Sequence, residues 1–278
     1  LTNKTVTNIT ASNQHTCAVT SDGTAACWGA NWWGQFGDGS TTSSNTPVAV
    51  TMSGALAGKT VVNITAGYYH TCAVTSDGTA ACWGYNGYGQ LGDGSTTQSN
   101  IPVAVTMSGA LTNKTVTNIT AGYNHTCAVT SDGTAACWGY NDQGQLGDGT
   151  ITNSNTPVAV TMSGALAGKT VTNITASNQH TCAVLSDGTA ACWGYNNEGQ
   201  LGNGTTTNST TPVAVTMSGT LGGKTVTKIT AGQFHTCAVL SDGTAACWGN
   251  NNGQLGDGTN TTRSTTPVAV TMSGALAG

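Results

Sequence analysis

The sequence predicts an all-β protein, specifically a β-propeller of four-stranded antiparallel blades. One unit of sequence recurs five times with a period of 55 residues, as the spacing of His15 and His70 illustrates. Each unit holds four short segments rich in Val, Thr and Ala, separated by clusters of Gly, Asn and Ser, which is the pattern of strands and turns. No segment has the apolar spacing of an amphipathic helix. A period of this length with four strands is typical of one propeller blade.

The repeats divide the chain, which we treat as one propeller domain of residues 1–278, into equal parts. Their bounds are 1–55, 56–110, 111–165, 166–220 and 221–275, with 276–278 starting a further repeat. In the first repeat we expect strands at 4–10, 15–20, 24–29 and 47–52. Pro47 would stand at the first position of the fourth strand, where proline is tolerated. The repeats form either a five-bladed ring or part of a larger propeller.

Two cysteines stand ten positions apart in every repeat, as in "HTCAVTSDGTAACWG" at residues 15–29. A three-residue loop of Ser, Asp and Gly, with Gly in the left-handed position of a bulge, would pair Thr20 with Thr24. Counting outward then places Cys17 opposite Cys27, within reach of a disulfide. The same count predicts five bridges in all: Cys17–Cys27, Cys72–Cys82, Cys127–Cys137, Cys182–Cys192 and Cys237–Cys247.

Metal and redox chemistry are the alternatives for these cysteines. A zinc site needs four ligands, and one repeat supplies only His15, Cys17 and Cys27. A redox pair is usually Cys-x-x-Cys at the start of a helix, and the Gly-Asp-Gly-Thr loops lack the ligand spacing of a known calcium loop. We therefore expect no metal and no cofactor, and we expect the histidines to be structural. Five disulfides place the protein in an oxidising setting, extracellular or at the cell surface.

Several positions of each repeat also match the repeat of a known family. In the second repeat they are Gly67, His70, Ala73, Asp77, Gly78, Trp83, Gly84, Asn86, Gly89, Gln90, Leu91 and Gly92. The pattern resembles the repeat of the regulator of chromosome condensation family, once per repeat over the whole chain, in an extracellular, disulfide-containing variety. The resemblance implies a β-propeller, usually of seven blades. The family's best-known activity, nucleotide exchange on a small nuclear GTPase, does not fit a disulfide-bonded chain, so we do not expect it here.

If the strands alternate in direction, the loops gather at two ends of the blades. One end collects the loops that vary between repeats and forms a candidate binding surface of Trp32, Trp33, Tyr68, Tyr69, Tyr88, Tyr123 and Phe234. The other end is nearly invariant and carries Lys4 near Asp22, with their counterparts in the other repeats. The five repeated tryptophans (Trp28, Trp83, Trp138, Trp193 and Trp248) are expected in the core between blades.

The composition excludes several functions. Only 6% of the residues are charged, the net charge is −4, and no block of Lys or Arg occurs, so we expect no nucleic-acid partner. Apolar runs are too short for membrane insertion. No nucleophile–base–acid set recurs, and Glu198 is the single Glu, so we expect no enzyme.

The first functional hypothesis is therefore a non-enzymatic extracellular structural or adhesive protein, part of a longer surface polymer or filament. Its partners would be copies of itself or neighbouring propellers in the same chain. The alternative is a secreted binding module, either a protein inhibitor or a lectin, that binds cell-surface proteins or glycans through the aromatic loops.

Overall fold

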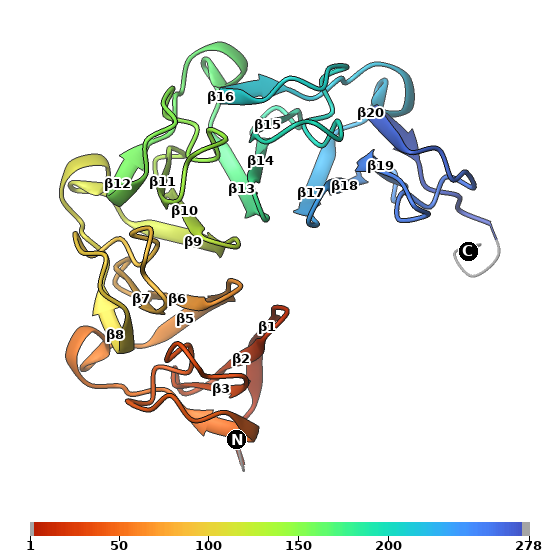
Figure 1. Cartoon of the computed structure of the whole chain (residues 1–278). Helices are drawn as coiled ribbons and strands as arrows, with labels where there is room; N and C mark the ends of the chain where they lie inside the picture. Colours follow the sequence, from red (N-terminus) through yellow and green to blue (C-terminus); the bar gives the residue numbers. More distant parts are fainter. Residues whose placement is uncertain (1–2, 274–278) are drawn as a thin grey trace. The chain divides into compact units, whose positions relative to one another are not determined.

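The computed structural model describes residues 3–273 and contains five four-stranded antiparallel sheets, one for each repeat (Figure 1). Blade 1 holds β1 (Val6–Ala11), β2 (His15–Thr20), β3 (Ala25–Gly29) and β4 (Ser44–Ala49). Blade 2 holds β5 (Val61–Ala66), β6 (His70–Thr75), β7 (Ala80–Gly84) and β8 (Ser99–Ala104). Blade 3 holds β9 (Val116–Ala121), β10 (His125–Thr130), β11 (Ala135–Gly139) and β12 (Ser154–Ala159).

The last two repeats have the same order. Blade 4 holds β13 (Val171–Ala176), β14 (His180–Leu185), β15 (Ala190–Gly194) and β16 (Ser209–Ala214). Blade 5 holds β17 (Val226–Ala231), β18 (His235–Leu240), β19 (Ala245–Asn250) and β20 (Arg263–Ala269). Short 3₁₀ turns connect successive blades: η1 (Gly54–Leu56), η2 (Gly109–Leu111), η3 (Gly164–Leu166) and η4 (Gly219–Leu221). These blades confirm the predicted all-β propeller architecture; the expected further repeat at 276–278 lies outside the described residues.

The chain separates into two compact units. The first comprises Leu1–Asn141 with Thr152–Ala159, and the second comprises Asp142–Ile151 with Val160–Gly278. The first unit therefore contains the strands of blades 1–3, and the second contains blades 4 and 5. No helix in the described part of the chain is long and apolar enough to span a membrane.

The fourth strand of each blade corrects the sequence prediction. The expected strand was 47–52, but β4 spans Ser44–Ala49, so Pro47 lies inside the strand. The prediction took proline as a strand start, whereas β4 is an edge strand that pairs only with β3. An edge strand has a free side for a residue without an N–H. The pairing of β3 with β4 also shifts in register: Cys27 lies opposite Val48, whereas Gly29 lies opposite Ser44. The additional residues of β4 between these two pairs form a bulge-like irregularity.

The hairpin of β2 and β3 has the predicted register. Thr20 N donates to Thr24 O at 2.9 Å, and Gly23 has a φ of +78°, the left-handed conformation that glycine adopts without steric cost. Cys17 consequently lies opposite Cys27. All five predicted disulfides are present, with Cα atoms 4.0–4.1 Å apart.

A tryptophan and a glutamine carbonyl organise each described contact between neighbouring blades. Gln35 O, in the β3–β4 loop, accepts from Trp83 Nε1 at 2.9 Å and from Thr71 Oγ1 at 2.7 Å in the next blade. Trp83 is fully buried, and Gly37 packs so closely under its indole that a Cβ there would lie 2.7 Å from Nε1. The same bonds recur between blades 2 and 3 and between blades 4 and 5.

Trp28 departs from the expected core position. Trp83, Trp138, Trp193 and Trp248 are fully buried, as predicted, whereas Trp28 is half-buried. The difference arises because the four buried indoles lie against a preceding loop, and no described residue packs in the equivalent way on blade 1.

Candidate binding surface

Seven aromatic side chains form a continuous cluster within the first unit. We call Trp33, Tyr68, Tyr69, Tyr85, Tyr88, Tyr123 and Tyr140 the aromatic cluster, and each of them is partly exposed. They come from the loops that follow the first and third strands of the blades. The predicted grouping of these two sets of loops at one end is therefore what the structure contains.

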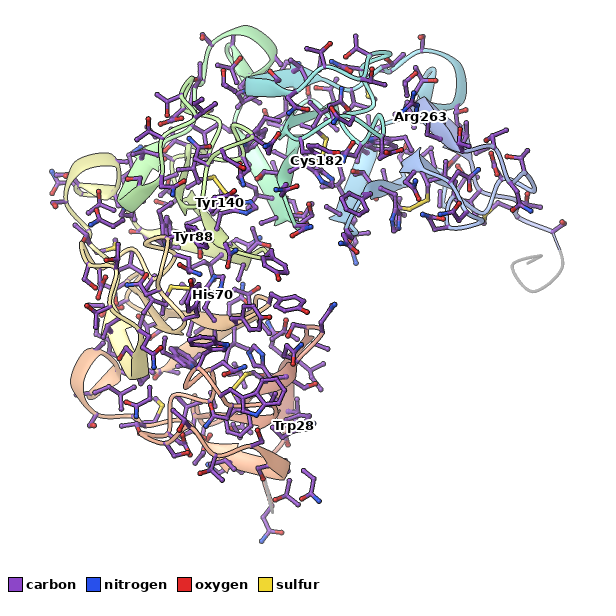
Figure 2. The ribbon with its side chains drawn as sticks, viewed as in Figure 1. Trp28, His70, Tyr88, Tyr140, Cys182 and Arg263 are labelled. Carbon is purple, nitrogen blue, oxygen red and sulfur yellow. A yellow bond between two sulfur atoms is a disulfide. The ribbon has the colours of Figure 1, made fainter. Side chains whose placement is uncertain are left out.

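Ring contacts join the cluster across three repeats. Trp33 of repeat 1 contacts Tyr85 of repeat 2, with centroids 4.8 Å apart and planes at 64°. Tyr68 contacts Tyr123 of repeat 3 at 4.2 Å. Tyr88 and Tyr140 lie 4.7 Å apart, and Figure 2 labels this pair. Each such pair contributes about 0.5–1.5 kcal/mol beyond the apolar area it buries, so the rings stabilise one another's positions.

Tyr69 lies at the centre of the cluster and remains a neutral hydrogen-bond donor. Burial raises its pKa to about 12, and hydrogen bonds with Tyr123 and Tyr68 add to this effect. Its hydroxyl thus stays protonated well above neutral pH. A tyrosine surface of this kind offers both apolar ring area and polar hydroxyl tips.

Buried glutamines support the loops from below. Gln35 Oε1 accepts from Trp33 N at 2.9 Å, and Gln90 Oε1 accepts from Tyr88 N at 3.0 Å. Both glutamines are fully buried. The aromatic loops are therefore held by Gln35 and Gln90, the same glutamines whose carbonyl groups accept hydrogen bonds from the next blade.

The repeated histidines form structural contacts between repeats. His15 Nε2 lies 2.7 Å from Thr71 Oγ1, and His70 Nε2 lies 2.9 Å from Thr126 Oγ1. Burial lowers the pKa of His15 to about 4 and that of His70 to about 3, so both imidazoles are neutral near pH 7. Figure 2 labels His70, which lies well inside its blade.

Comparisons with known proteins agree with this architecture. Residues 1–276 match the family model of the RCC1-like domain. The chain belongs to the RCC1-like domain family.

The RCC1-like domain has relatives with varied overall functions. It is 33% identical to the ultraviolet-B receptor UVR8 of Arabidopsis thaliana over 91% of this chain and 55% of the relative. It is 31% identical to the human E3 ubiquitin-protein ligase HERC2 over 86% of this chain and 5% of that protein. The chain thus spans about half of UVR8 and a small part of HERC2.

Two solved structures show the same fold. Human WBSCR16 superposes with a TM-score of 0.83 at 24% identity, covering 97% of this chain and 68% of that chain. Yeast RCC1 (Prp20), in a structure with Kap60, superposes with a TM-score of 0.80 at 20% identity, covering 97% and 62%. They match the propeller that the sequence predicts.

The opposite end of the RCC1-like domain carries the predicted lysines and aspartates as pairs within each repeat. Lys4 Nζ lies 2.8 Å from Asp22 Oδ2, and the four counterparts lie at 2.8–3.2 Å. Hydrogen bonds from Lys4, Thr20 and Thr24 hold the pKa of Asp22 well below its usual range. Both partners are partly exposed, so each pair contributes little to stability.

An asparagine amide occupies the oxygen-rich loop that begins with Gly-Asp-Gly. Asn31 Nδ2 lies 3.2–3.4 Å from Asp38 Oδ1, Ser40 O, Ser40 Oγ and Thr42 O, while its Oδ1 accepts from Phe36 N at 2.8 Å. The loop oxygens of this RCC1-like domain therefore surround an amide. Among residues 3–273, no group of three or more His, Cys, Asp or Glu side chains is placed to hold a metal ion.

Not all predicted surface residues join the aromatic cluster. Trp33, Tyr68, Tyr69, Tyr88 and Tyr123 belong to it, whereas Trp32 is 64% exposed and makes none of its described ring contacts. Phe234 lies in the second unit, where it contacts Tyr195 at 6.2 Å.

Sequence reasoning missed two members of the cluster, Tyr85 and Tyr140. Both directly follow a Trp-Gly pair. Tyr85 lies in the same variable loop as Tyr88, and Tyr140 lies in the equivalent loop of the next blade, so this repeated position was the available signal.

Proposed function

We propose that this RCC1-like domain is a non-catalytic recognition module that binds a protein partner through its aromatic cluster, outside the cell. The observation that carries the proposal is the continuity of seven partly exposed rings across three repeats. Tyr and Trp dominate the binding energy of protein interfaces, because they supply a large area at little entropic cost. Rings that already hold one another lose less freedom on binding.

The relatives support a protein partner without identifying it. One similar structure contains yeast RCC1 with a second protein, Kap60. The present chain shares 20% identity with that RCC1, so the comparison supports the capacity of the fold for protein recognition.

The disulfides support an extracellular or cell-surface location. Ten cysteines form five bridges, and no free cysteine is described. Such bridges persist in oxidising compartments and are rare in the cytosol. Detection of the native protein with ten free thiols, by mass spectrometry after alkylation, would contradict this part of the proposal.

Binding of the labelled chain to intact cells of the source organism tests the role of the cluster. Tyr68→Ser/Tyr123→Ser removes the 4.2 Å contact at its centre, and Tyr195→Ser removes a partly exposed ring in the second unit as a matched control. We expect wild type and the control to bind equally and the double variant to lose at least tenfold in affinity. Equal binding of all three proteins would exclude the cluster as the site, and loss of wild-type binding after glycosidase treatment of the cells would favour a lectin.

A structural or adhesive role in a surface polymer is the second candidate. The specific observation in its favour is the uniform Lys–Asp end, which is repeated in all five blades. Negative-stain electron microscopy of native material tests it: regular beaded fibres would support the polymer, and dispersed particles would contradict it.

A further inference from the structure

The disulfides of the described chain lie within blades and never between them. Each bridge links two cysteines ten positions apart, across the hairpin of a single blade. Blades 2 and 3 instead contact each other through an apolar core that includes Val74, Ile119 and Trp138, and through the hydrogen bond from Trp138 Nε1 to Gln90 O. A covalent bond between these blades would therefore restrain a contact that the disulfides leave unrestrained.

Two tyrosines from these neighbouring blades lie against each other in the aromatic cluster. Tyr68, in the β5–β6 loop, and Tyr123, in the β9–β10 loop, have ring centroids 4.2 Å apart and planes at 32°. Both side chains are partly exposed, so a small oxidant in solution can reach them. The equivalent residues of the other repeats are Asn13, Asn178 and Gln233, so this pairing belongs to blades 2 and 3.

The backbone holds the two loops together independently of the rings. Tyr68 N donates to Gly122 O at 3.1 Å, and Ala121 N donates to Thr65 Oγ1 at 3.1 Å. A Cβ on Gly67 would lie 2.6 Å from Gly122 O, so the loops approach this closely only because residue 67 is glycine. Groups held close together react far faster than groups that must first meet by diffusion.

The hydroxyl groups of the pair converge on a third tyrosine. Tyr69 forms side-chain hydrogen bonds with both Tyr123 and Tyr68. Because the hydroxyls meet there, the Cε carbons beside them also lie near one another. These carbons are the positions at which phenoxyl radicals couple, since the unpaired electron is shared with the carbons ortho to the oxygen. Tyr69 itself stands edge-on to both rings, at 83° to Tyr68 and 73° to Tyr123, whereas the other two rings are closest to parallel.

We propose that Tyr68 and Tyr123 form a site of oxidative cross-linking, at which hydrogen peroxide, activated by a peroxidase, joins blades 2 and 3 through a dityrosine bond. Each phenol first loses one electron and its hydroxyl proton. A bond then forms between one Cε carbon of each ring, and the hydrogen on each of these carbons moves to the oxygen and restores the hydroxyl. Two electrons and two protons leave the pair in total, and hydrogen peroxide takes them up to form two water molecules.

No thiol of the chain competes for the oxidant. All ten cysteines are held in disulfides, so none is free to reduce a tyrosyl radical. The inference uses the oxidising, extracellular location proposed above, because peroxide and peroxidases act on the chain there without competition from cytosolic thiols. It does not depend on the partner proposed for the aromatic cluster.

Treatment of the purified chain with hydrogen peroxide and a haem peroxidase tests the site. We expect the monomer to gain dityrosine fluorescence and to lose the mass of two hydrogen atoms, and its reduced digest to contain one joined peptide pair that carries Tyr68 and Tyr123. Tyr68→Phe and Tyr123→Phe keep the ring and remove only the hydroxyl, so each should abolish the joined peptides. Tyr195→Phe is the matched control, because Tyr195 is partly exposed and its described ring contact is with Phe234, which has no hydroxyl to oxidise.

The outcomes separate this cross-link from other oxidation. Absence of dityrosine in the wild type, or an unchanged yield in either Tyr68→Phe or Tyr123→Phe, would overturn the proposal. A yield that rises with protein concentration and appears as covalent dimers would also overturn it, because the coupling would then occur between molecules. The urea midpoint of the cross-linked chain should be higher, since the bond closes a long loop in the unfolded chain, and an unchanged midpoint would reject its role as a restraint between blades.

The binding role and the cross-link can fail separately. Cell binding that persists in a Tyr68→Phe chain without the cross-link would retain the binding surface alone. A chain that forms the joined peptides but binds no cells would retain the cross-linking site alone.

Discussion

Gly37→Ala provides a direct measure of how tightly neighbouring blades pack. Gly37 has a φ of +70°, and a Cβ there would lie 2.7 Å from Trp83 Nε1. Alanine costs about 1–2 kcal/mol in the left-handed conformation. Forcing a methyl group into a packed core costs a further 1–3 kcal/mol, roughly. The expected loss in the free energy of unfolding is therefore about 2–5 kcal/mol.

Gly54→Ala is the matched control for this substitution. Gly54 has a nearly equal φ of +63°, but a Cβ there meets nothing within 4 Å. Only the backbone cost applies, so the expected loss is about 1–2 kcal/mol. The difference between the two variants isolates the contact with Trp83.

Urea unfolding followed by tryptophan fluorescence measures both losses from the shift in the unfolding midpoint. Equal shifts for Gly37→Ala and Gly54→Ala would refute the reasoning, because the indole would then be free to move away from the added methyl group. A smaller shift for Gly37→Ala than for the control would refute it more strongly.

Three further predictions concern pH, the disulfides and the exposed ion pairs. Burial lowers the pKa of His70 to about 3, so the unfolded chain binds more protons than the folded chain between that value and about 6.5. Stability should therefore fall as the pH drops through this window. His70→Gln should reduce the slope of the urea midpoint against pH, and the other buried histidines should supply the remaining slope. A flat wild-type profile from pH 6.5 to about 5, above the range in which the aspartates of the unfolded chain take up protons, would contradict this. The pair Cys72→Ala/Cys82→Ala should lose roughly 2–3 kcal/mol in thermal or urea unfolding, since the bridge closes a short loop, and a gain in stability would show that the bridge is strained. Lys59→Gln should change the free energy of unfolding by less than about 1 kcal/mol, because Lys59 is 28% and Asp77 51% exposed; a larger loss would show that the Lys–Asp pairs stabilise the blade.

The local sequence pattern was sufficient to predict the blades and their disulfide bonds. The period defined five units, and the three-residue loop of Ser21, Asp22 and Gly23 determined the hairpin register that places Cys17 opposite Cys27. These features depend on residues close in sequence, where turn chemistry dictates which side chains face each other. The position of β4 escaped prediction, because the pairing of Pro47 depends on which edge of the sheet stays open.

The candidate surface was only partly predictable, because it depends on contacts between repeats. Position in a variable loop marked Tyr68 and Tyr123 as surface aromatics, but only packing of one blade on the next brings their rings to 4.2 Å. Tyr85 was overlooked, although it contacts Trp33 from the neighbouring repeat.

The sequence by itself determined the repeat, the all-β class and the disulfide pairs, since each follows from short-range spacing. The tertiary structure decided which rings form one surface and which backbone carbonyl accepts the hydrogen bond of each buried tryptophan. The physical reason is that the burial and the partners of a side chain depend on which residues of a neighbouring repeat pack against it. These neighbours are distant in the sequence, so the local pattern does not reveal them.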